Sequence, residues 1–473
     1  MEGVSFLSNN SGFARVLSRR DVLALAFGAM IGWGWVVLAG EWIRAAGSVG
    51  AMIAFVVGGI LVTFVGLTYA ELASAMPKAG GELLYSYRGL GVLPSFICAW
   101  TIVLGYISVV SFEAVALPTV VEYLFPGYKQ GYLWTVAGWD VYASWALVGI
   151  AGSIVLCIVN YVGVKMAAFM QTVFTIFIAA GGIMLITGSL FNGSTADMQP
   201  LFTGGMAGIF TVLIMTPFMF VGFDVIPQAA EEMDIPHKTI GRILIASVLM
   251  ASVWYVLIIF GVSRALSPAE LETTGLATAD AMTALFGGAW AGKLLVLAGI
   301  AGIITSWNGF YIGASRLLYA MSQAKMLPEF LGRLHPKYKT PYNAIILIGI
   351  ISSIAPLFGR KMLVWLVDAG GLGVVVAYLA VALSFLVLRY REPNMPRPFT
   401  VSNGKLVGFI AVLMSIGMAI MYLPGSPSAL VWPYEWAIVL GWMALGVVFY
   451  IFAKMKHGNE ADRLLNEKVR DNS

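Results

Sequence analysis

The chain has 473 residues, of which 59% are hydrophobic and 11% are charged, and its formal net charge is +4. Soluble domains carry roughly 25% charged residues, so this composition excludes a water-exposed globular protein and predicts a surface covered mostly by lipid. The small positive charge is spread over many loops, which argues against nucleic-acid binding.

Apolar stretches of about 20 residues, the length that crosses a hydrocarbon core of ~30 Å, recur along the whole chain. The segments between them are too short to form a soluble domain. We expect twelve membrane-spanning helices, at residues 21–46, 49–76, 94–124, 142–162, 166–190, 206–233, 239–264, 292–320, 341–358, 363–390, 405–424 and 433–453.

The basic residues predict the orientation of these helices, because cytoplasmic loops are enriched in Lys and Arg. With a cytoplasmic N-terminus, few of the 28 Lys and Arg residues fall in the outer segments, namely Arg44, Lys129, Arg264, Lys293, Arg360 and Lys361. We therefore expect a multi-pass protein of the cell membrane with both termini in the cytoplasm.

The first expected helix contains the stretch GAMIGWGWVVLAG, residues 28–40. Glycine costs about 1 kcal/mol against alanine inside a helix, and Gly28, Gly32 and Gly34 fall within seven positions. Non-helical backbone at membrane depth is tolerated only inside protein or beside a watery cavity. The glycines indicate either a break of this kind or close packing of helices.

The sixth expected helix favours the break. Its sequence, TPFMFVGFDVIPQAAEEMDIPHKTIGR, contains Pro217, Gly222 and Pro227 within one membrane segment, and proline removes a helix hydrogen bond. Helices one and six are equivalent members of two five-helix halves, and the second half is inverted because five is odd. Interrupted helices at equivalent positions of inverted repeats indicate the central binding site of a transporter.

Four motifs in this order resemble the amino acid–polyamine–organocation (APC) superfamily. They are the two interrupted helices, the loop AELASAMPKAGGELLYSYRGLG at 70–91 and the segment ASRLLYAMSQAKMLPEFLGRLHPKYKTP at 314–341. The resemblance implies an all-α membrane protein with a five-plus-five inverted repeat and broken first and sixth helices. It divides the chain into a cytoplasmic N-terminal segment (1–20), two repeats (21–190 and 206–390), helices eleven and twelve (405–453) and a cytoplasmic tail (454–473).

The resemblance also implies a substrate site formed by the two breaks. A substrate carboxylate would bind the amides of Gly32, Trp33 and Gly34, because helix N-termini attract anions. Other residues of the implied substrate site are Met30, Phe218 and Val221, whose carbonyls would hold an amine, and Phe223 and Phe310, which would form aromatic walls. Trp33 replaces the small residue of many relatives, so it either lines the pocket or faces a neighbouring helix.

Two buried acids are candidates for proton coupling, because a charge at the centre of a membrane helix is costly and functional by default. Asp224 lies at the sixth-helix break, where it either carries a proton or caps the following half-helix. Glu113 in the third helix could carry a proton or pair with a cationic substrate. Lys165 resembles the lysine that replaces sodium in sodium-independent relatives, and its alternative is a snorkelling topology residue.

The expected function is secondary active transport of amino acids or related small amines by alternating access, proton-coupled or exchanging, and independent of sodium. The alternatives are a cationic amine or polyamine antiporter and, less favoured, a channel or transporter-like receptor. No Walker A sequence, intramembrane histidine cluster or nucleophile elbow is present, so we expect no enzyme activity, catalytic residue, metal or cofactor. The expected partners are the small-molecule substrate, protons and membrane lipid, and the oligomeric state is not predicted.

Overall fold

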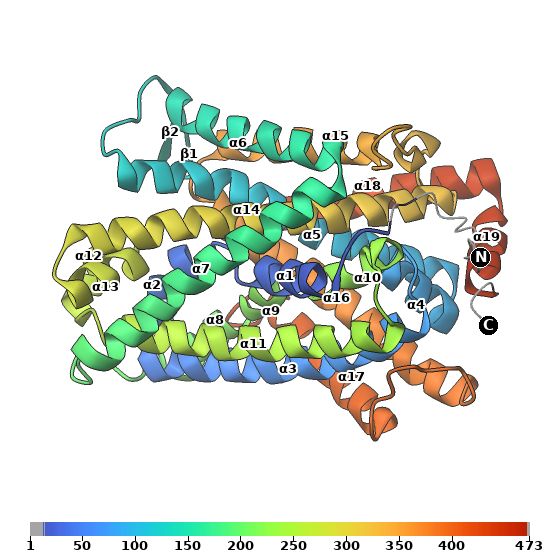
Figure 1. The fold of residues 1–473 in the computed structure, drawn as a ribbon, viewed down its shortest axis with the longest axis horizontal. Helices are drawn as coiled ribbons and strands as arrows, with labels where there is room; N and C mark the ends of the chain where they lie inside the picture. The colour runs from blue at the N-terminus through green and yellow to red at the C-terminus, as the bar shows by residue number, and fades with distance from the viewer. Residues whose placement is uncertain (1–12, 14, 471–473) are drawn as a thin grey trace, which may run out of the picture.

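The computed structural model describes residues 13 and 15–470, without the side chains of 164–166 and 470. Its long helices lie roughly along one axis (Figure 1). In this described part, eleven helical segments are long and apolar enough to cross a membrane. They are α1 (Arg19–Met30) with α2 (Gly34–Ala46), α3 (Ser48–Ala75), α5 (Val92–Leu124), α6 (Ala143–Val162), α7 (Val164–Asn192), α8 (Gly205–Leu213) with α9 (Thr216–Phe220) and α10 (Val225–Gln228), α11 (His237–Ser263), α14 (Ala289–Gln323), α16 (Met362–Arg391), α17 (Gly404–Met421) and α18 (Tyr434–His457).

The remaining predicted span, 341–358, is also helical but shorter. It forms α15 (Tyr342–Ile354) and continues as the 3₁₀ turn η3 (Ala355–Phe358). Seventeen residues at 1.5 Å each extend about 25 Å, less than a hydrocarbon core of ~30 Å. Eleven of the twelve predicted spans are thus confirmed by length and composition, and the twelfth is a shorter apolar helix.

Several short elements lie in segments that the sequence analysis treated as connections. They are α4 (Gly81–Leu90), β1 (Tyr132–Val136), β2 (Trp139–Tyr142), η1 (Ala230–Glu232), α12 (Pro268–Thr273), α13 (Ala277–Phe286), η2 (Glu329–Gly332) and α19 (Glu460–Arg470). Strands β1 and β2 form an antiparallel hairpin whose two turn residues, Ala137 and Gly138, both have positive φ. Two-residue turns with positive φ match the twist of the strands they join.

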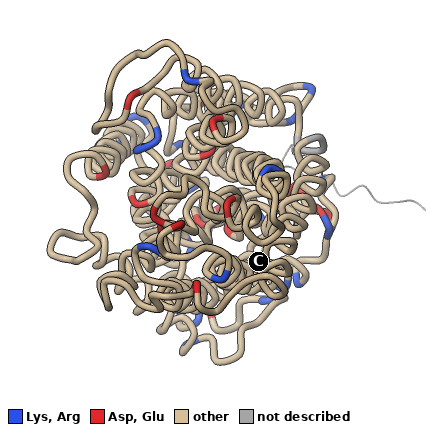
Figure 2. The backbone as a smooth tube through the Cα atoms, turned by 90° about the vertical axis from the view of Figure 1, so that its left-hand side faces the viewer, with Lys and Arg blue, Asp and Glu red and all other residues tan. Residues whose placement is uncertain are grey.

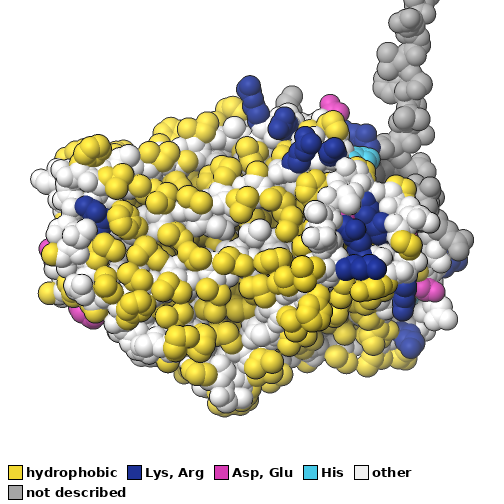
Figure 3. Space-filling view, turned by 90° about the horizontal axis from the view of Figure 1, so that it is seen from below, with side chains coloured by type: hydrophobic (Ala, Val, Ile, Leu, Met, Phe, Trp, Pro, Cys, Tyr) yellow, Lys and Arg dark blue, Asp and Glu magenta, His cyan; other side chains and the backbone are white. Residues whose placement is uncertain are grey.

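The two ends of the molecule differ in charge. Both termini lie at one end, here called the termini end, and the β-hairpin, α12 and α13 lie at the other, the hairpin end (Figure 1). Hydrophobic side chains cover the middle of the face shown in Figure 3, and most Lys and Arg side chains on that face gather at the termini end. This distribution agrees with the basic bias that predicts a cytoplasmic termini end.

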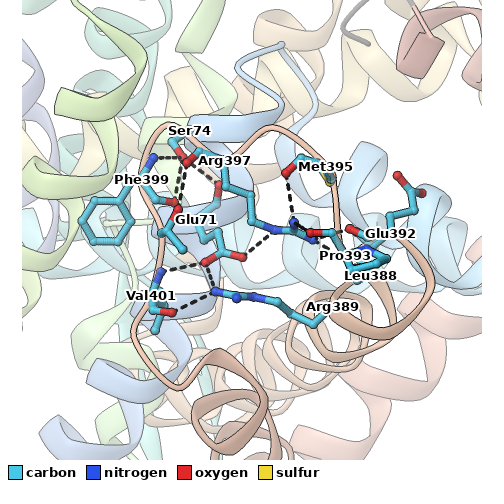
Figure 4. A network of polar contacts seen from close by, with 11 residues as sticks. Glu71, Ser74, Leu388, Arg389, Glu392, Pro393, Met395, Arg397, Phe399 and Val401 are labelled. Carbon is cyan, nitrogen blue, oxygen red and sulfur yellow. Dashed lines mark hydrogen bonds and ion pairs between the residues drawn. The ribbon is translucent and has the colours of Figure 1, made fainter.

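Figure 4 shows a buried ion network at the termini end. Glu71, near the end of α3, pairs with Arg389 at the end of α16 and, at 2.9 Å, with Arg397. It also accepts a hydrogen bond of 2.8 Å from the Val401 amide, while the Phe399 amide donates to Ser74 at 3.1 Å. The segment that joins α16 to α17 is therefore fastened to α3.

Candidate functional site

The first helix break lies between α1 and α2. Helix α1 closes where the Ile31 amide donates to Phe27 at 2.9 Å, and α2 begins at Gly34. Among the described residues, the amides of Gly32, Trp33 and Gly34 donate to no backbone carbonyl. Such a helix start carries partial positive charge and can bind an anion. The predicted interruption of the first span is thus present.

The second helix break lies between α9 and α10. Gly222 has φ +138°, a conformation that L side chains rarely adopt, and a Cβ on it would lie 2.9 Å from the Met30 nitrogen. Within the described residues, no backbone amide donates to the carbonyls of Phe218 or Val221. Glycine therefore lets the two breaks approach each other, and the second break leaves carbonyl oxygens available.

Tyr255 of α11 joins the two breaks. Its hydroxyl lies 2.5 Å from the Met30 carbonyl oxygen and 2.8 Å from that of Met219. The ring is buried and stacks on Phe55 at a centroid distance of 5.0 Å. This tyrosine fixes the spacing between α1 and α9, and the sequence analysis did not select it.

A small cavity of about 20 Å³ lies between the breaks. Its lining includes seven of the residues selected from the sequence: Met30, Gly32, Glu113, Phe218, Val221, Phe310 and Gly34. It also includes Phe112, Tyr255 and Ser306, which were not selected as site residues. Four elements meet at this cavity: the start of α2, the end of α9 and the facing sides of α5 and α14.

Glu113 is the only charged residue among the described residues that line this cavity. Its side chain is 1% exposed, and its Oε2 has no hydrogen-bond partner. The carboxylate lies within hydrogen-bonding reach of the Ser306 hydroxyl and the Trp33 amide. One of its oxygens therefore faces the helix start, and the other is unpaired in the interior.

Two predicted site residues point elsewhere. Trp33 is fully buried, and its ring lies against Gly299 of α14, so closely that a Cβ on Gly299 would overlap it. Phe223 packs edge-on against Tyr69, at a centroid distance of 5.3 Å, and tilted against Tyr378, at 5.5 Å. Neither residue lines the cavity. Each of these side chains fills a gap between helices, and the part that either residue takes in substrate binding stays a prediction.

Asp224 lies outside the cavity, in a second polar cluster. This cluster also contains Glu82, Tyr106 and Tyr378 and is here called the Asp224 cluster. Its Oδ1 accepts a hydrogen bond of 2.8 Å from the Gly222 amide, and its Oδ2 has no hydrogen-bond partner. The side chain makes no capping bond to α10, although Asp224 precedes that helix. The choice between a proton-carrying role and a capping role for Asp224 stays a prediction. In the end-on view of Figure 2, several acidic residues lie within the ring of helices.

Glu82 of α4 is the second acid of this cluster. It is fully buried, and it accepts hydrogen bonds from the Gln228 amide group and, at 3.4 Å, from the Tyr106 hydroxyl. Burial, and then the nearby charge of Asp224, raise the pKa of Glu82 well above its usual value. In the sequence, Glu82 directly follows Gly80 and Gly81 of the loop motif, and this position could have marked it as a site residue. The sequence analysis did not select it.

The prediction for Lys165 concerns a side chain outside the described residues. Gln171, six residues further along α7, belongs to a polar network that links α6, α7 and α14. Asn308 accepts from Asn160 and donates to Gln171, both at 3.0 Å. The role of Lys165 remains a prediction.

The fold and the cavity define a class, a multi-pass helical membrane protein with a small site between two interrupted helices. The sequence matches the family described as amino acid permease over residues 17–453. The chain therefore belongs to the amino acid permease family, within the APC superfamily that its motifs resemble.

Three curated relatives come from Bacillus subtilis. The chain is 26% identical to the branched-chain amino acid permease BcaP, with 96% of each chain covered. It is 25% identical to a methylthioribose transporter, with 97% of each covered, and 27% identical to the serine/threonine exchanger SteT, with 86% of this chain and 90% of that protein covered. All three are named as transporters.

Proposed function

We propose that this chain is a secondary active transporter that carries an amino acid or a related small amine across the cell membrane by alternating access. The cavity between the two breaks is the observation that supports this proposal. The residues at the start of α2, whose amides donate to no backbone carbonyl among the described residues, and those at the end of α9, whose carbonyls accept from no backbone amide there, both line it. Half-helix ends of this kind hold charged groups at the centre of transporters.

Alternating access follows from the proposed inverted repeat. The first half (21–190) and the second half (206–390) each begin with an interrupted helix, and the breaks meet at Met30 and Gly222. The elements of spans one, two, six and seven would move as a bundle against the rest. The Gly222 contact and the Tyr255 hydroxyl would keep the two interrupted helices together during that movement.

Transport is coupled to protons in this proposal, and sodium is not required. Glu113 and Asp224 each have one carboxylate oxygen that is buried and unpaired, and an unpaired buried carboxylate is costly unless it takes up a proton. Glu113 lines the cavity, whereas Asp224 lies outside it in the Asp224 cluster. Both are expected to gain and lose protons during a transport cycle.

Uptake by purified protein in proteoliposomes tests the proposal. Radiolabelled leucine and 3-methylbutylamine are supplied separately, with and without a proton gradient, and with sodium or potassium as the external cation. We expect at least one compound to accumulate above protein-free vesicles, to respond to the gradient and to be indifferent to sodium. Accumulation that requires sodium, or that does not respond to the proton gradient, would contradict proton coupling. Uptake that occurs only when the vesicles are preloaded with substrate would indicate exchange instead.

A further inference from the structure

A groove runs between α3 and α11 on the outside of the helix bundle. Its volume is about 550 Å³, and its lining comes from residues 56–64 of α3 and 249–257 of α11. The two helices meet closely at its floor, because a Cβ on Gly59 would lie only 2.8 Å from the Ser252 hydroxyl oxygen. Both helices lie along the lower edge of Figure 1, and Figure 3 shows the hydrophobic surface on that side. The groove is therefore open to lipid.

The lining of this groove is apolar. Val253, on its wall, is 58% exposed. Thr63 and Ser252 line it too, but each hydroxyl donates to a carbonyl one turn earlier in its own helix, at 2.7 and 2.9 Å. No charged residue belongs to the described lining. The groove therefore accepts a hydrocarbon chain and offers no hydrogen-bonding partner to a polar solute.

Two basic residues continue one side of α11 towards the termini end. Lys238, Arg242, Leu249 and Val253 follow one another at intervals of four or seven residues, and such intervals place side chains on one side of a helix. Lys238 and Arg242 are both exposed. Arg242 lies seven residues, or about 10 Å, along the helix from Leu249, the first groove residue of α11.

The positive charge at this end of the groove has no acidic partner. Within the described part of the chain, neither Lys238 nor Arg242 forms an ion pair, and Asp234, the nearest acid in the sequence, pairs with neither. The start of α11 adds the partial positive charge of a helix N-terminus. Lys and Arg side chains gather at this end of the face in Figure 3. Basic side chains at a membrane surface attract anionic headgroups.

We infer that the groove and its basic end bind one anionic phospholipid, with its phosphate beside Lys238 and Arg242 and an acyl chain in the groove. A leaflet is half of the ~30 Å hydrocarbon core, or about 15 Å deep. A chain that begins beside Arg242 therefore extends past Leu249 into the part of the groove nearest the termini end. This site shares no residue with the cavity between the breaks, so the inference is independent of the proposed substrate.

Native mass spectrometry of the purified protein tests this inference with phosphatidylglycerol and phosphatidylcholine of identical chains. We expect the first phosphatidylglycerol to bind roughly tenfold more tightly than phosphatidylcholine, because two basic side chains favour its negative charge. The difference should shrink as the ammonium acetate concentration rises, because salt screens exposed charges. Equal affinity of the two lipids for the wild-type protein would overturn the inference.

Charge variants test the headgroup contact. Lys238→Gln combined with Arg242→Gln should lower the affinity for phosphatidylglycerol to that for phosphatidylcholine. The matched control, Lys454→Gln combined with Lys456→Gln in α18, removes two other exposed charges at the termini end and should bind phosphatidylglycerol as the wild-type protein does. Equal losses in the two double variants would indicate attraction by the whole basic surface and would overturn the specific site.

A further pair of variants tests the chain contact. Val253→Trp fills the groove and should weaken both lipids several-fold, whereas Val155→Trp, at a position 54% exposed in α6 and outside the groove, should not. Undiminished binding by Val253→Trp would contradict the inference. Phosphatidylglycerol with a diazirine at the end of one chain should crosslink to residues 56–64 or 249–257 of the wild-type protein. Crosslinks only at other residues would overturn the site even where a variant fails to fold.

Discussion

At the residue scale, the two acids of the proposed coupling differ in their surroundings. Glu113 faces the cavity, whereas Asp224 is held by the Gly222 amide and lies beside the buried Tyr106, Tyr378 and Glu82. A carboxylate that is buried and only half-paired favours its neutral form. A proton on Asp224 would therefore be gained or lost when the second break moves.

The substitution Asp224→Asn removes that titration while it keeps the shape of the side chain. We expect the dependence of uptake on pH to become weaker, with a smaller difference between the rates at acidic and neutral pH, because only Glu113 of the two acids can still gain and lose a proton. The measurement is the initial uptake rate between pH 5 and pH 8. The control is Glu41→Gln, because Glu41 of α2 is exposed and pairs with Arg44 at 2.6 Å outside the cavity. A pH profile identical to that of the wild-type protein would remove Asp224 from the coupling.

Tyr255 provides a second prediction at this scale. Tyr255→Phe keeps the ring that packs on Phe55 and removes only the hydroxyl that contacts Met30 and Met219. Loss of a buried hydrogen bond costs about 1–3 kcal/mol, so we expect a lower melting temperature and slower uptake. Uptake at the wild-type rate would show that the bridge between the breaks is dispensable.

At the element scale, the helix breaks depend on glycine. Gly222 has a positive φ, and a side chain there would press on the Met30 backbone. Glycine residues that only allow helix packing would keep ordinary helical angles, so the conformation of Gly222 distinguishes a break from close packing.

Gly222→Ala should therefore destabilise the protein by about 1–3 kcal/mol, the usual cost of a strained backbone position, and should abolish most uptake. The matched control is Gly441→Ala in α18, where a Cβ would meet nothing within 4 Å. The control should be neutral or slightly stabilising, because alanine favours helix. Equal melting temperatures for the two variants would contradict the structural role of the break.

The helices and their interruptions could be predicted from the sequence, because length, hydropathy, glycine and proline are local signals. Helix α4 and the β-hairpin were missed: ten residues are too few for a span, and the Ala137–Gly138 turn is not one of the common hairpin signals. The backbone part of the cavity was predicted through the family motifs. The directions of Trp33 and Phe223 were not, because helical periodicity does not apply within a break.

At the scale of the whole molecule, the distribution of Lys and Arg and the shared direction of the long helices indicate the same axis across the membrane. The termini end carries the buried pair of Glu232 with Arg316, at 2.7 Å, in addition to the network of Glu71. Arg316 follows the cavity residue Phe310 by six positions, or about 9 Å along α14. This ion pair therefore lies about 9 Å further along α14 than the cavity residue Phe310.

Cysteine accessibility tests the proposed orientation. Thr195→Cys lies at the hairpin end and Asn466→Cys in α19 at the termini end, and both positions are exposed; Cys98 and Cys157 are first replaced by alanine. In intact bacterial cells, a membrane-impermeant maleimide should label Thr195→Cys, and should label Asn466→Cys only after permeabilisation. The reverse pattern would place both termini outside the cell.

The Tyr255 hydroxyl has fewer hydrogens to donate than it has acceptors nearby. A phenol carries one hydrogen, yet two carbonyl oxygens, those of Met30 and Met219, lie close enough to accept it. At any instant one of the two is left without that donor, at the rim of a cavity that already contains an unpaired carboxylate oxygen. The ammonium group of the proposed amino acid or amine substrate carries three hydrogens, so it could donate to the carbonyl that lacks a donor and to Glu113 while the Tyr255 hydroxyl keeps its other partner.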